Sequence, residues 1–125
     1  MTPLVCLATA IFFEAGVESY DGKLAVAEVI LNRVEDRRYP NDICSVVFEP
    51  KQFSFTHDGK PDVLPSGVNA TGSVVVAKEA LQGKSLGITS THYIADYASA
   101  SWQEAFDYDG RIGVHLFYTN NTPYR

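Results

Sequence analysis

The chain has 125 residues, of which 46% are hydrophobic and 20% charged, and its formal net charge is −5. This length and composition are typical of a globular protein with one hydrophobic core, and they argue against a disordered chain. The acidic balance and the lack of a basic cluster argue against nucleic acid as a partner. We therefore expect a single domain over residues 1–125 that acts as a monomer.

The most apolar stretch, Leu4 to Phe13, is shorter than the ~20 residues that a membrane helix needs. It has neither the preceding basic region nor the following cleavage site of a signal peptide, so we expect no leader and no membrane anchor. Thr2 and Pro3 provide a cap and a first-turn proline. Apolar residues then recur every three or four positions, which predicts a helix to about Glu14.

Glu14 is the first candidate for chemistry. It follows Ile11, Phe12 and Phe13 on an element whose other face must be buried. A carboxyl group in such a setting loses solvation, so its pKa rises and it can act as a general acid. The alternative is a solvated acid in the last turn of a helix that Gly16 ends.

A second helix is predicted from a cap at Asp21 to about Val34. Its residues are apolar almost all round, which is typical of a helix in the middle of a domain. Glu28 is the acid inside this apolar stretch. We predict that it pairs with an arginine such as Arg33, and the alternative is a second catalytic carboxylate.

The middle of the chain predicts less regular structure, with a short turn over residues 45–49. Residues 51–57 alternate, which predicts a strand with Gln52, Ser54 and Thr56 on one face and Phe53 and Phe55 on the other. The stretch 58–65 contains a glycine and two prolines and reads as a long loop beside a binding cleft.

The second half predicts a third helix from residues 69–71 to Gly83, with Val74, Val75, Ala77, Ala80 and Leu81 buried. A strand at 91–95, a short helix at 99–106, a turn at 107–110 and a last strand at 112–118 follow. In that last strand His115 alternates with the main apolar row and faces away from it. The fold class is therefore α+β, with three main helices and short antiparallel strands.

Three chemistries are compatible with these residues. The first is acid catalysis on a glycosidic bond by Glu14, usually with a second carboxylate roughly 5 to 9 Å away. The candidates for that partner are Glu18, Asp21, Asp58 and Asp62. A single acid suffices where the substrate supplies its own nucleophile, as the 6-hydroxyl of a muramic acid unit can.

The second chemistry is a thiolate at Cys6 with His92 or His115 as its base, as in peptidases that cut peptidoglycan stems. The third is a zinc site from His57, His92, His115 and a carboxylate, although their spacing matches no short metal motif. Cys6 and Cys44 also fit no metal spacing, and they are either two thiols or a disulfide. We expect no cofactor.

Several blocks of the chain, in order, resemble the spore-cortex-lytic (SleB-like) cell-wall hydrolases, a family also found in bacteriophages. Residues 11–18 are similar to its I-Y-x-E-A-R-G-E opening, and residues 22–34 to its G-x-x-A-V-A-x-V-I-L-N-R-V helix. Residues 46–54 resemble its V-V-Y-x-P-x-Q-F-S segment. The pieces T-H-Y at 91–93 and G-x-H-x-F-Y at 113–118 complete the match.

The resemblance implies a lysozyme-like α+β domain that cleaves peptidoglycan glycan strands between N-acetylmuramic acid and N-acetylglucosamine, as a lytic transglycosylase. The catalytic acid falls on Glu14, and Gln52, Ser54, Tyr93 and His115 would contact substrate. A hydrolytic muramidase and a Cys-dependent amidase or endopeptidase are the alternatives. Gly16-Val17 stands where the family has Arg-Gly, so any contact of that arginine is absent or supplied elsewhere.

The resemblance also implies where the protein works. A bacteriophage endolysin would start directly at its catalytic domain, be made in the cytoplasm and reach the cell wall or periplasm through a phage holin. A piece of a longer protein would start there too. We therefore expect a bacteriolytic endolysin whose partners are peptidoglycan glycan strands.

Overall fold

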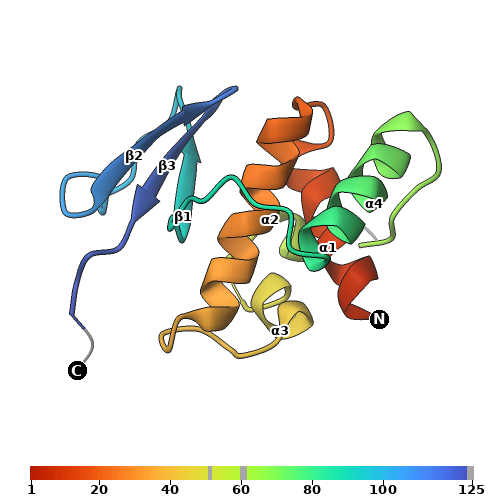
Figure 1. Cartoon of the computed structure of the whole chain (residues 1–125), viewed down its shortest axis with the longest axis horizontal. Coiled ribbons are helices and arrows are strands. Elements are labelled where there is room, and N and C mark those ends of the chain that lie inside the picture. The colour runs from red at the N-terminus through yellow and green to blue at the C-terminus, as the bar shows by residue number, and fades with distance from the viewer. Residues whose placement is uncertain (51, 60–61, 124–125) are drawn as a thin grey trace.

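The computed structural model describes residues 1–50, 52–59 and 62–123, and it confirms the α+β class (Figure 1). Its elements are, in chain order, α1 (Pro3–Ala15), α2 (Tyr20–Glu35), α3 (Ile43–Val47), the 3₁₀ helix η1 (Ser54–His57), α4 (Val68–Leu81), β1 (His92–Ala95), β2 (Asp107–Ile112) and β3 (His115–Thr119). The three strands form an antiparallel sheet in the order β1-β3-β2. No described helix has the length and apolar character needed to cross a bilayer.

Helix α2 lies between the sheet and the other helices (Figure 1). Seven successive residues, Leu24 to Ile30, are buried, as predicted for a central helix. Leu24, Ala27 and Ile30 pack into the core shared with α1 and α4. Ala25 and Val29 pack on Phe117 of β3. The helix therefore joins two apolar cores, and its end near Arg33 lies where the helical part meets the sheet.

Side-chain caps mark the starts of α1 and α2. Thr2 accepts a hydrogen bond from the Val5 N–H at 3.2 Å, as the sequence predicted. The predicted cap of α2 is wrong, because Ser19 rather than Asp21 accepts from the Gly22 N–H, at 3.1 Å. A cap must precede the N–H that it accepts by two or three residues, and Asp21 already lies in the first turn.

Cys6 and Cys44 form a disulfide, with their Cα atoms 5.3 Å apart. Cys6 is fully buried in α1, and Cys44 lies in the first turn of α3, which Asp42 caps through the Ser45 N–H. The bridge joins the start of α1 to a short helix 38 residues away in sequence. Of the two alternatives left open by the sequence, the structure has the disulfide.

The predicted strand over 51–57 is wrong, although its two faces are right. Lys51 lies outside the described residues, and residues 54–57 form η1. Phe53 and Phe55 are buried whereas Gln52 and Ser54 are exposed. The Phe55 ring stacks on Phe13 at 4.8 Å. The sheet of the described residues consists of β1, β3 and β2, so this segment pairs with no strand. Its two phenylalanines pack into the helical core instead.

The carboxyl-terminal predictions also need correction. The predicted helix over 99–106 is wrong, because residues 101–105 form turns. Residues 107–119 form a β2–β3 hairpin with a turn at Gly113 and Val114, not a turn and one strand. His115 and Phe117 are the buried row of β3, so His115 faces the helices. Two of the predicted buried residues of α4 are wrong. Val75 and Leu81 are 46% and 43% exposed, and Val76 is buried instead.

The segment between α4 and β1 crosses over α2 (Figure 1), and Glu28 holds it there. The carboxylate accepts hydrogen bonds from the Ser85 hydroxyl at 2.5 Å and from the N–H groups of Leu86, Gly87 and Ile88 at 2.8 to 3.1 Å. The predicted Glu28–Arg33 pair is therefore wrong. Positions five apart on a helix are about 140° apart around its axis, so the two side chains point in different directions.

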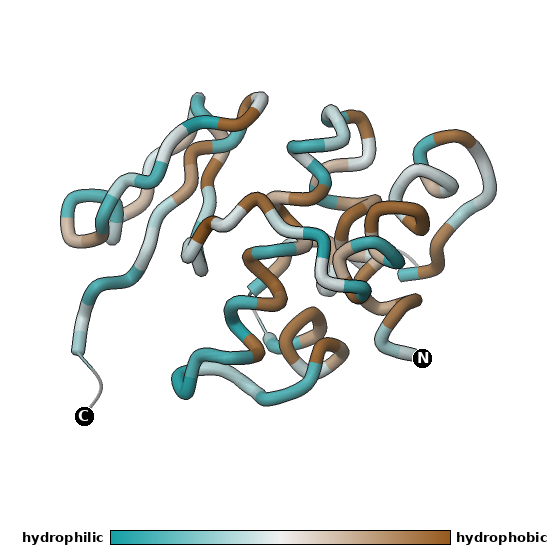
Figure 2. Tube along the Cα trace, in the orientation of Figure 1, coloured by the Kyte–Doolittle hydropathy of each residue, from teal (hydrophilic) through white to brown (hydrophobic). Residues whose placement is uncertain are grey.

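Asn32, one turn after Glu28, donates hydrogen bonds to the carbonyls of Ile88 and Ser90. Hydrophobic residues are concentrated in the helices, whereas the chain just after α2 is hydrophilic (Figure 2). Polar side chains of α2 thus fix the position of the strand β1 that follows the crossing segment.

Candidate active site

Glu14 lies in the last turn of α1 and is half-buried. The neighbouring Phe13 ring is held between Phe12 and Phe55, with ring centroids 5.1 and 4.8 Å away. The hydroxyl of Tyr93, on β1, donates a short hydrogen bond to Glu14 Oε1. The end of α1 and the first strand of the sheet, 79 residues apart, meet at this carboxyl group.

The environment of Glu14 favours its protonated form. Burial raises the pKa of the Glu14 carboxyl, and it outweighs the Tyr93 hydrogen bond and the charge of Arg33, which both lower it. Burial and the neighbouring carboxyl raise the pKa of the Tyr93 phenol well above its ordinary value, so Tyr93 remains the donor. The Glu14 carboxyl therefore keeps its proton to a higher pH than an exposed glutamate does.

The two oxygens of Glu14 have different surroundings. Oε1 receives the Tyr93 hydroxyl, whereas Oε2 has no hydrogen-bond partner among the described residues. Among the described residues, Nδ1 of His115 is the one buried side-chain oxygen or nitrogen atom without a hydrogen-bond partner. Oε2 is therefore not buried. It is the oxygen that can transfer a proton to a bound molecule.

Arg33 is the cation of this site. Its side chain is only 6% exposed. Nε donates to the Thr91 carbonyl at 2.8 Å, and Nη1 lies 3.4 Å from Oε1 of Gln52. The guanidinium carbon sits over the rings of Tyr39 and Phe53, at 5.1 and 5.3 Å. The sequence predicted this arginine as a partner of Glu28 and missed its place here.

His115 lies beside Tyr93, with ring centroids 4.9 Å apart. The side chain is 8% exposed, and burial lowers the pKa of its imidazole, against the charges of Glu18 and Asp96. Nδ1 is buried without a hydrogen-bond partner among the described residues. The ring is thus a neutral group behind Tyr93.

The sequence-predicted contact residues are brought together unevenly. Tyr93 contacts Glu14 directly, His115 lies against Tyr93, and Gln52 contacts Arg33. Ser54 is exposed at the start of η1, one residue before the Phe55 that packs against Phe13. Tyr93 contacts the acid itself, a role that its sequence position does not reveal.

Of the four candidate second carboxylates, Glu18 has a hydrogen-bond partner other than Glu14. Glu18 Oε1 accepts the Val114 N–H at 3.1 Å, and it lies where a side chain on Gly113 would sit. Glu18 therefore connects the α1–α2 turn to the tip of the β2–β3 hairpin. Asp21 is exposed in the first turn of α2, and Asp58 and Asp62 flank the undescribed residues 60–61.

The described residues do not provide the Cys6 thiolate or the zinc site that the sequence left open. Cys6 is in a disulfide, so it offers no thiolate. His92 and His115 lie on opposite faces of the sheet, since His92 pairs with Tyr118 and His115 with Ala95. The His57 side chain lies outside the described part of the structure. No cluster of three or more His, Cys, Asp or Glu in the described ranges could hold a metal ion.

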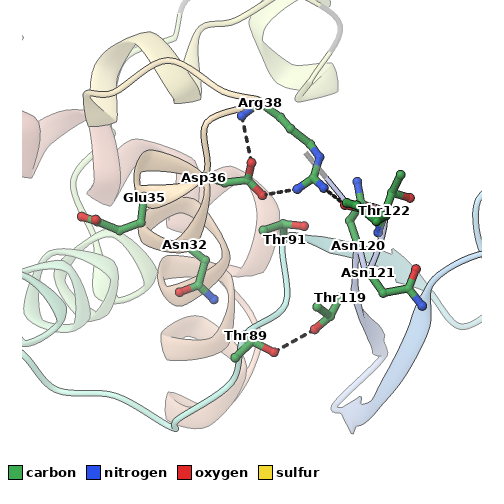
Figure 3. A pocket seen from close by; sticks show the side chains of 11 residues that line it. Asn32, Glu35, Asp36, Arg38, Thr89, Thr91, Thr119, Asn120, Asn121 and Thr122 are labelled. Atoms are coloured by element: carbon green, nitrogen blue, oxygen red, sulfur yellow. Dashed lines mark hydrogen bonds and ion pairs between the residues drawn. The ribbon is translucent and has the colours of Figure 1, made fainter. Parts of the chain in front are cut away.

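A polar pocket of about 380 Å³ lies away from Glu14, where the end of α2, the 89–91 segment and the chain after β3 meet (Figure 3). Hydroxyl and amide side chains line it, among them Asn32, Thr89, Thr91, Thr119 and Asn120. Thr89 and Thr119 join their hydroxyls across it at 2.9 Å. The pocket contains none of the predicted site residues. Glu14, an acid with a desolvated carboxyl group and a fixed hydrogen bond, therefore stays the candidate for the chemistry.

Two solved catalytic domains have a fold similar to that of this chain. The catalytic domain of the germination-specific lytic transglycosylase SleB from Bacillus anthracis superposes with a TM-score of 0.81 at 29% identity, covering 94% of this chain and 93% of that one. The catalytic domain of the Bacillus cereus SleB protein gives the same TM-score at 28% identity, with 94% and 89% covered.

Curated relatives extend beyond this chain. The spore cortex-lytic enzyme of Bacillus subtilis (strain 168) is 35% identical over 112 residues, which are 89% of this chain and 35% of the relative. That of Bacillus cereus is 34% identical over 89% of this chain and 42% of the relative. The chain thus spans between a third and a half of the length of these relatives. These relatives are bacterial, and the bacteriophage endolysin stays a prediction.

The family comparison covers most of the chain. The model of a family described as Cell Wall Hydrolase matches residues 17–118, from just after Glu14 to the end of the buried row of β3. The matched range includes Arg33, Gln52, Tyr93 and His115. Together with the SleB-like fold, this match shows that the chain belongs to the cell wall hydrolase family.

Proposed function

We propose that this protein cleaves peptidoglycan glycan strands between N-acetylmuramic acid and N-acetylglucosamine as a lytic transglycosylase, with Glu14 as its acid and base. The observation that carries the proposal is the Glu14 carboxyl: burial raises its pKa, Tyr93 fixes one oxygen, and the other oxygen is open. The names of the relatives, a spore cortex-lytic enzyme and a lytic transglycosylase, support the same substrate and reaction.

In the first step, Glu14 Oε2 gives its proton to the glycosidic oxygen as the bond from that oxygen to the muramic C1 breaks. N-acetylglucosamine leaves with a free hydroxyl. In the second step, the Glu14 carboxylate removes the proton of the muramic 6-hydroxyl while its oxygen bonds to C1. This closes a 1,6-anhydro ring, consumes no water and returns Glu14 to its protonated form.

The other groups at the site have separate roles. Tyr93 orients Glu14 and keeps Oε1 engaged, so Oε2 is the oxygen presented to the substrate. Gln52 and Ser54, exposed next to buried phenylalanines, supply polar contacts to the sugars, and His115 supports the ring of Tyr93. Glu18 is engaged by the hairpin, which favours a mechanism with one acid over one with two.

Mass spectrometry of a sacculus digest tests the reaction. Transglycosylation releases muropeptides with 1,6-anhydro-muramic ends, whereas hydrolysis adds one water to each cut strand. We expect anhydro ends from the wild type, none from Glu14→Gln, and wild-type amounts from the matched control Glu79→Gln. Glu79 makes a hydrogen bond with Tyr20 that a glutamine oxygen can also accept.

Two outcomes contradict the proposal. Reducing muramic ends without anhydro ends would make the protein a muramidase. Products cut only in the stem peptides would make it an amidase or endopeptidase and would remove Glu14 from its role.

A further inference from the structure

The guanidinium of Arg33 is buried, and it has no paired carboxylate among the described residues. The ion pairs formed within the described residues join Arg38 to Asp36 and Arg111 to Asp96, and neither includes Arg33. Its fixed contacts are a backbone carbonyl, an amide oxygen and two ring faces. A buried cation without a counter-ion is costly, because neutral partners replace only part of its hydration.

The unused donors of Arg33 point to where a counter-ion can bind. Nε and Nη1 make its hydrogen bonds, and Nη2 has none within the described ranges. His115 Nδ1 is the one fully buried side-chain oxygen or nitrogen atom without a partner in those ranges. Nη2 has no partner either, so it is not fully buried. One edge of the guanidinium is thus fixed by Thr91 and Gln52, and the Nη2 donors have no hydrogen-bond partner among the described residues.

The fixed edge makes Arg33 a preorganised binding group. Packing between Tyr39 and Phe53 holds the plane of the guanidinium, and the Thr91 carbonyl sets its rotation. A planar guanidinium with free N–H groups matches a carboxylate, which it can bind through two parallel hydrogen bonds. Thr91, which holds Nε, is two residues before Tyr93, which donates to Glu14, so a group bound by Arg33 would lie close to the candidate site.

We propose that Arg33 binds a carboxylate of the glycan substrate and makes the enzyme selective for strands that carry one near the cleaved bond. This inference rests on the proposed function. Two parts of peptidoglycan supply such a carboxylate: the lactyl group of a muramic acid unit without a peptide, and the acidic residues of a stem peptide. In both cases Arg33 determines specificity and transfers no proton.

Binding measured in the Glu14→Gln variant separates this role from any effect of Arg33 through the Glu14 charge. The ligands are tetrasaccharides of alternating N-acetylglucosamine and N-acetylmuramic acid with free lactyl carboxylates, with stem peptides, and with either carboxylate converted to a methylamide. Calorimetry gives Kd for each ligand against Glu14→Gln alone and combined with Arg33→Met, Arg33→Lys or, as the matched control, Arg111→Gln. Arg111 lies on β2 with a half-exposed side chain.

We expect Glu14→Gln to bind one carboxylate form about tenfold to a hundredfold more tightly than its methylamide, as a charge-assisted hydrogen bond implies. Arg33→Met should abolish that preference, Arg33→Lys should keep part of it, and Arg111→Gln should keep all of it. The lactyl and peptide ligands show which carboxylate Arg33 binds.

Three results would overturn the inference. The first is equal affinity for carboxylate and methylamide in the parent variant, which needs no change at Arg33 and so does not depend on the folding of its variants. The second is an equal loss for both ligands in Arg33→Met, and the third is loss of the preference in Arg111→Gln. A parent that binds no glycan at all while the wild type leaves sacculi intact contradicts the proposed function instead.

Discussion

Glu14 and Glu28 are both glutamates among apolar residues on neighbouring helices, yet the chain surrounds them differently. Glu28, in the middle of α2, receives four hydrogen bonds, three of them from backbone N–H groups, and it fixes the crossing segment. Glu14, at the end of α1, receives one, from a side chain, and keeps one oxygen open. A carboxylate with several fixed donors is a structural anchor, whereas a desolvated carboxyl with one donor is available for proton transfer.

The largest expected effect is on activity at Glu14. Glu14→Gln keeps the shape of the side chain but removes its transferable proton, so the rate of sacculus lysis should fall by about 10²- to 10⁴-fold. The thermal midpoint should stay within a few degrees of the wild type, because an isosteric amide replaces a partly desolvated acid. Turbidity assays and circular dichroism measure the two quantities. Lysis at the wild-type rate would break the comparison.

Glu28 should show the opposite pattern. Glu28→Gln turns an amide N–H₂ toward groups that are themselves donors, which should lower the free energy of unfolding by about 3–4 kcal/mol. Lysis per folded molecule should change little, since Glu28 does not face the site. Urea unfolding gives the stability, with Glu35→Gln at the exposed end of the same helix as control. A stable but inactive Glu28→Gln variant would mean that both acids serve catalysis.

The disulfide belongs with Glu28 on the structural side of the comparison. The double variant Cys6→Ala, Cys44→Ala removes a bridge across 38 residues and should cost about 3–4 kcal/mol of unfolding free energy. Lysis by the folded fraction should remain. Abolished lysis in a variant that is still folded would revive a Cys6-dependent peptidase.

Tyr93 provides the smallest and most specific effect. Its hydrogen bond lowers the pKa of Glu14, so Tyr93→Phe should raise that pKa further. The protonated acid then persists to higher pH, and the alkaline limb of the rate profile should move to higher pH. Rates between pH 4 and 9 measure the shift. An alkaline limb that moves to lower pH would contradict the assigned hydrogen bond.

The sequence predicts the parts of the fold that depend on local patterns. The continuous apolar run of α2 and the Thr2-Pro3 start of α1 act within one element, and both are found as expected. Glu14 was also predictable as an unusual acid, because the apolar residues around it are its immediate neighbours in sequence. For the other matched segments of the chain, the prediction came from the family resemblance and not from local patterns.

What the sequence could not give depends on contacts between distant residues. The alternation at 51–57 is typical of a strand, but this segment pairs with no strand among the described residues, and Ser54–His57 forms η1 instead. Tyr93 meets Glu14 across 79 residues, and the backbone groups that bind Glu28 lie 58 to 60 residues away. The place of Arg33 was partly predictable, because its spacing from Glu28 already excludes a shared helix face.

The protonation of Glu14 in the folded protein is the most direct test of its role as an acid. Carbon-13 NMR of the glutamate side-chain carboxyls, recorded as a function of pH for the wild type and Glu14→Gln, identifies the Glu14 signal by its absence from the variant. We predict that this signal titrates above pH 4.5, the ordinary value for the group, because burial outweighs Tyr93 and Arg33. A midpoint at or below pH 4.5 would contradict the role of Glu14 as the proton donor.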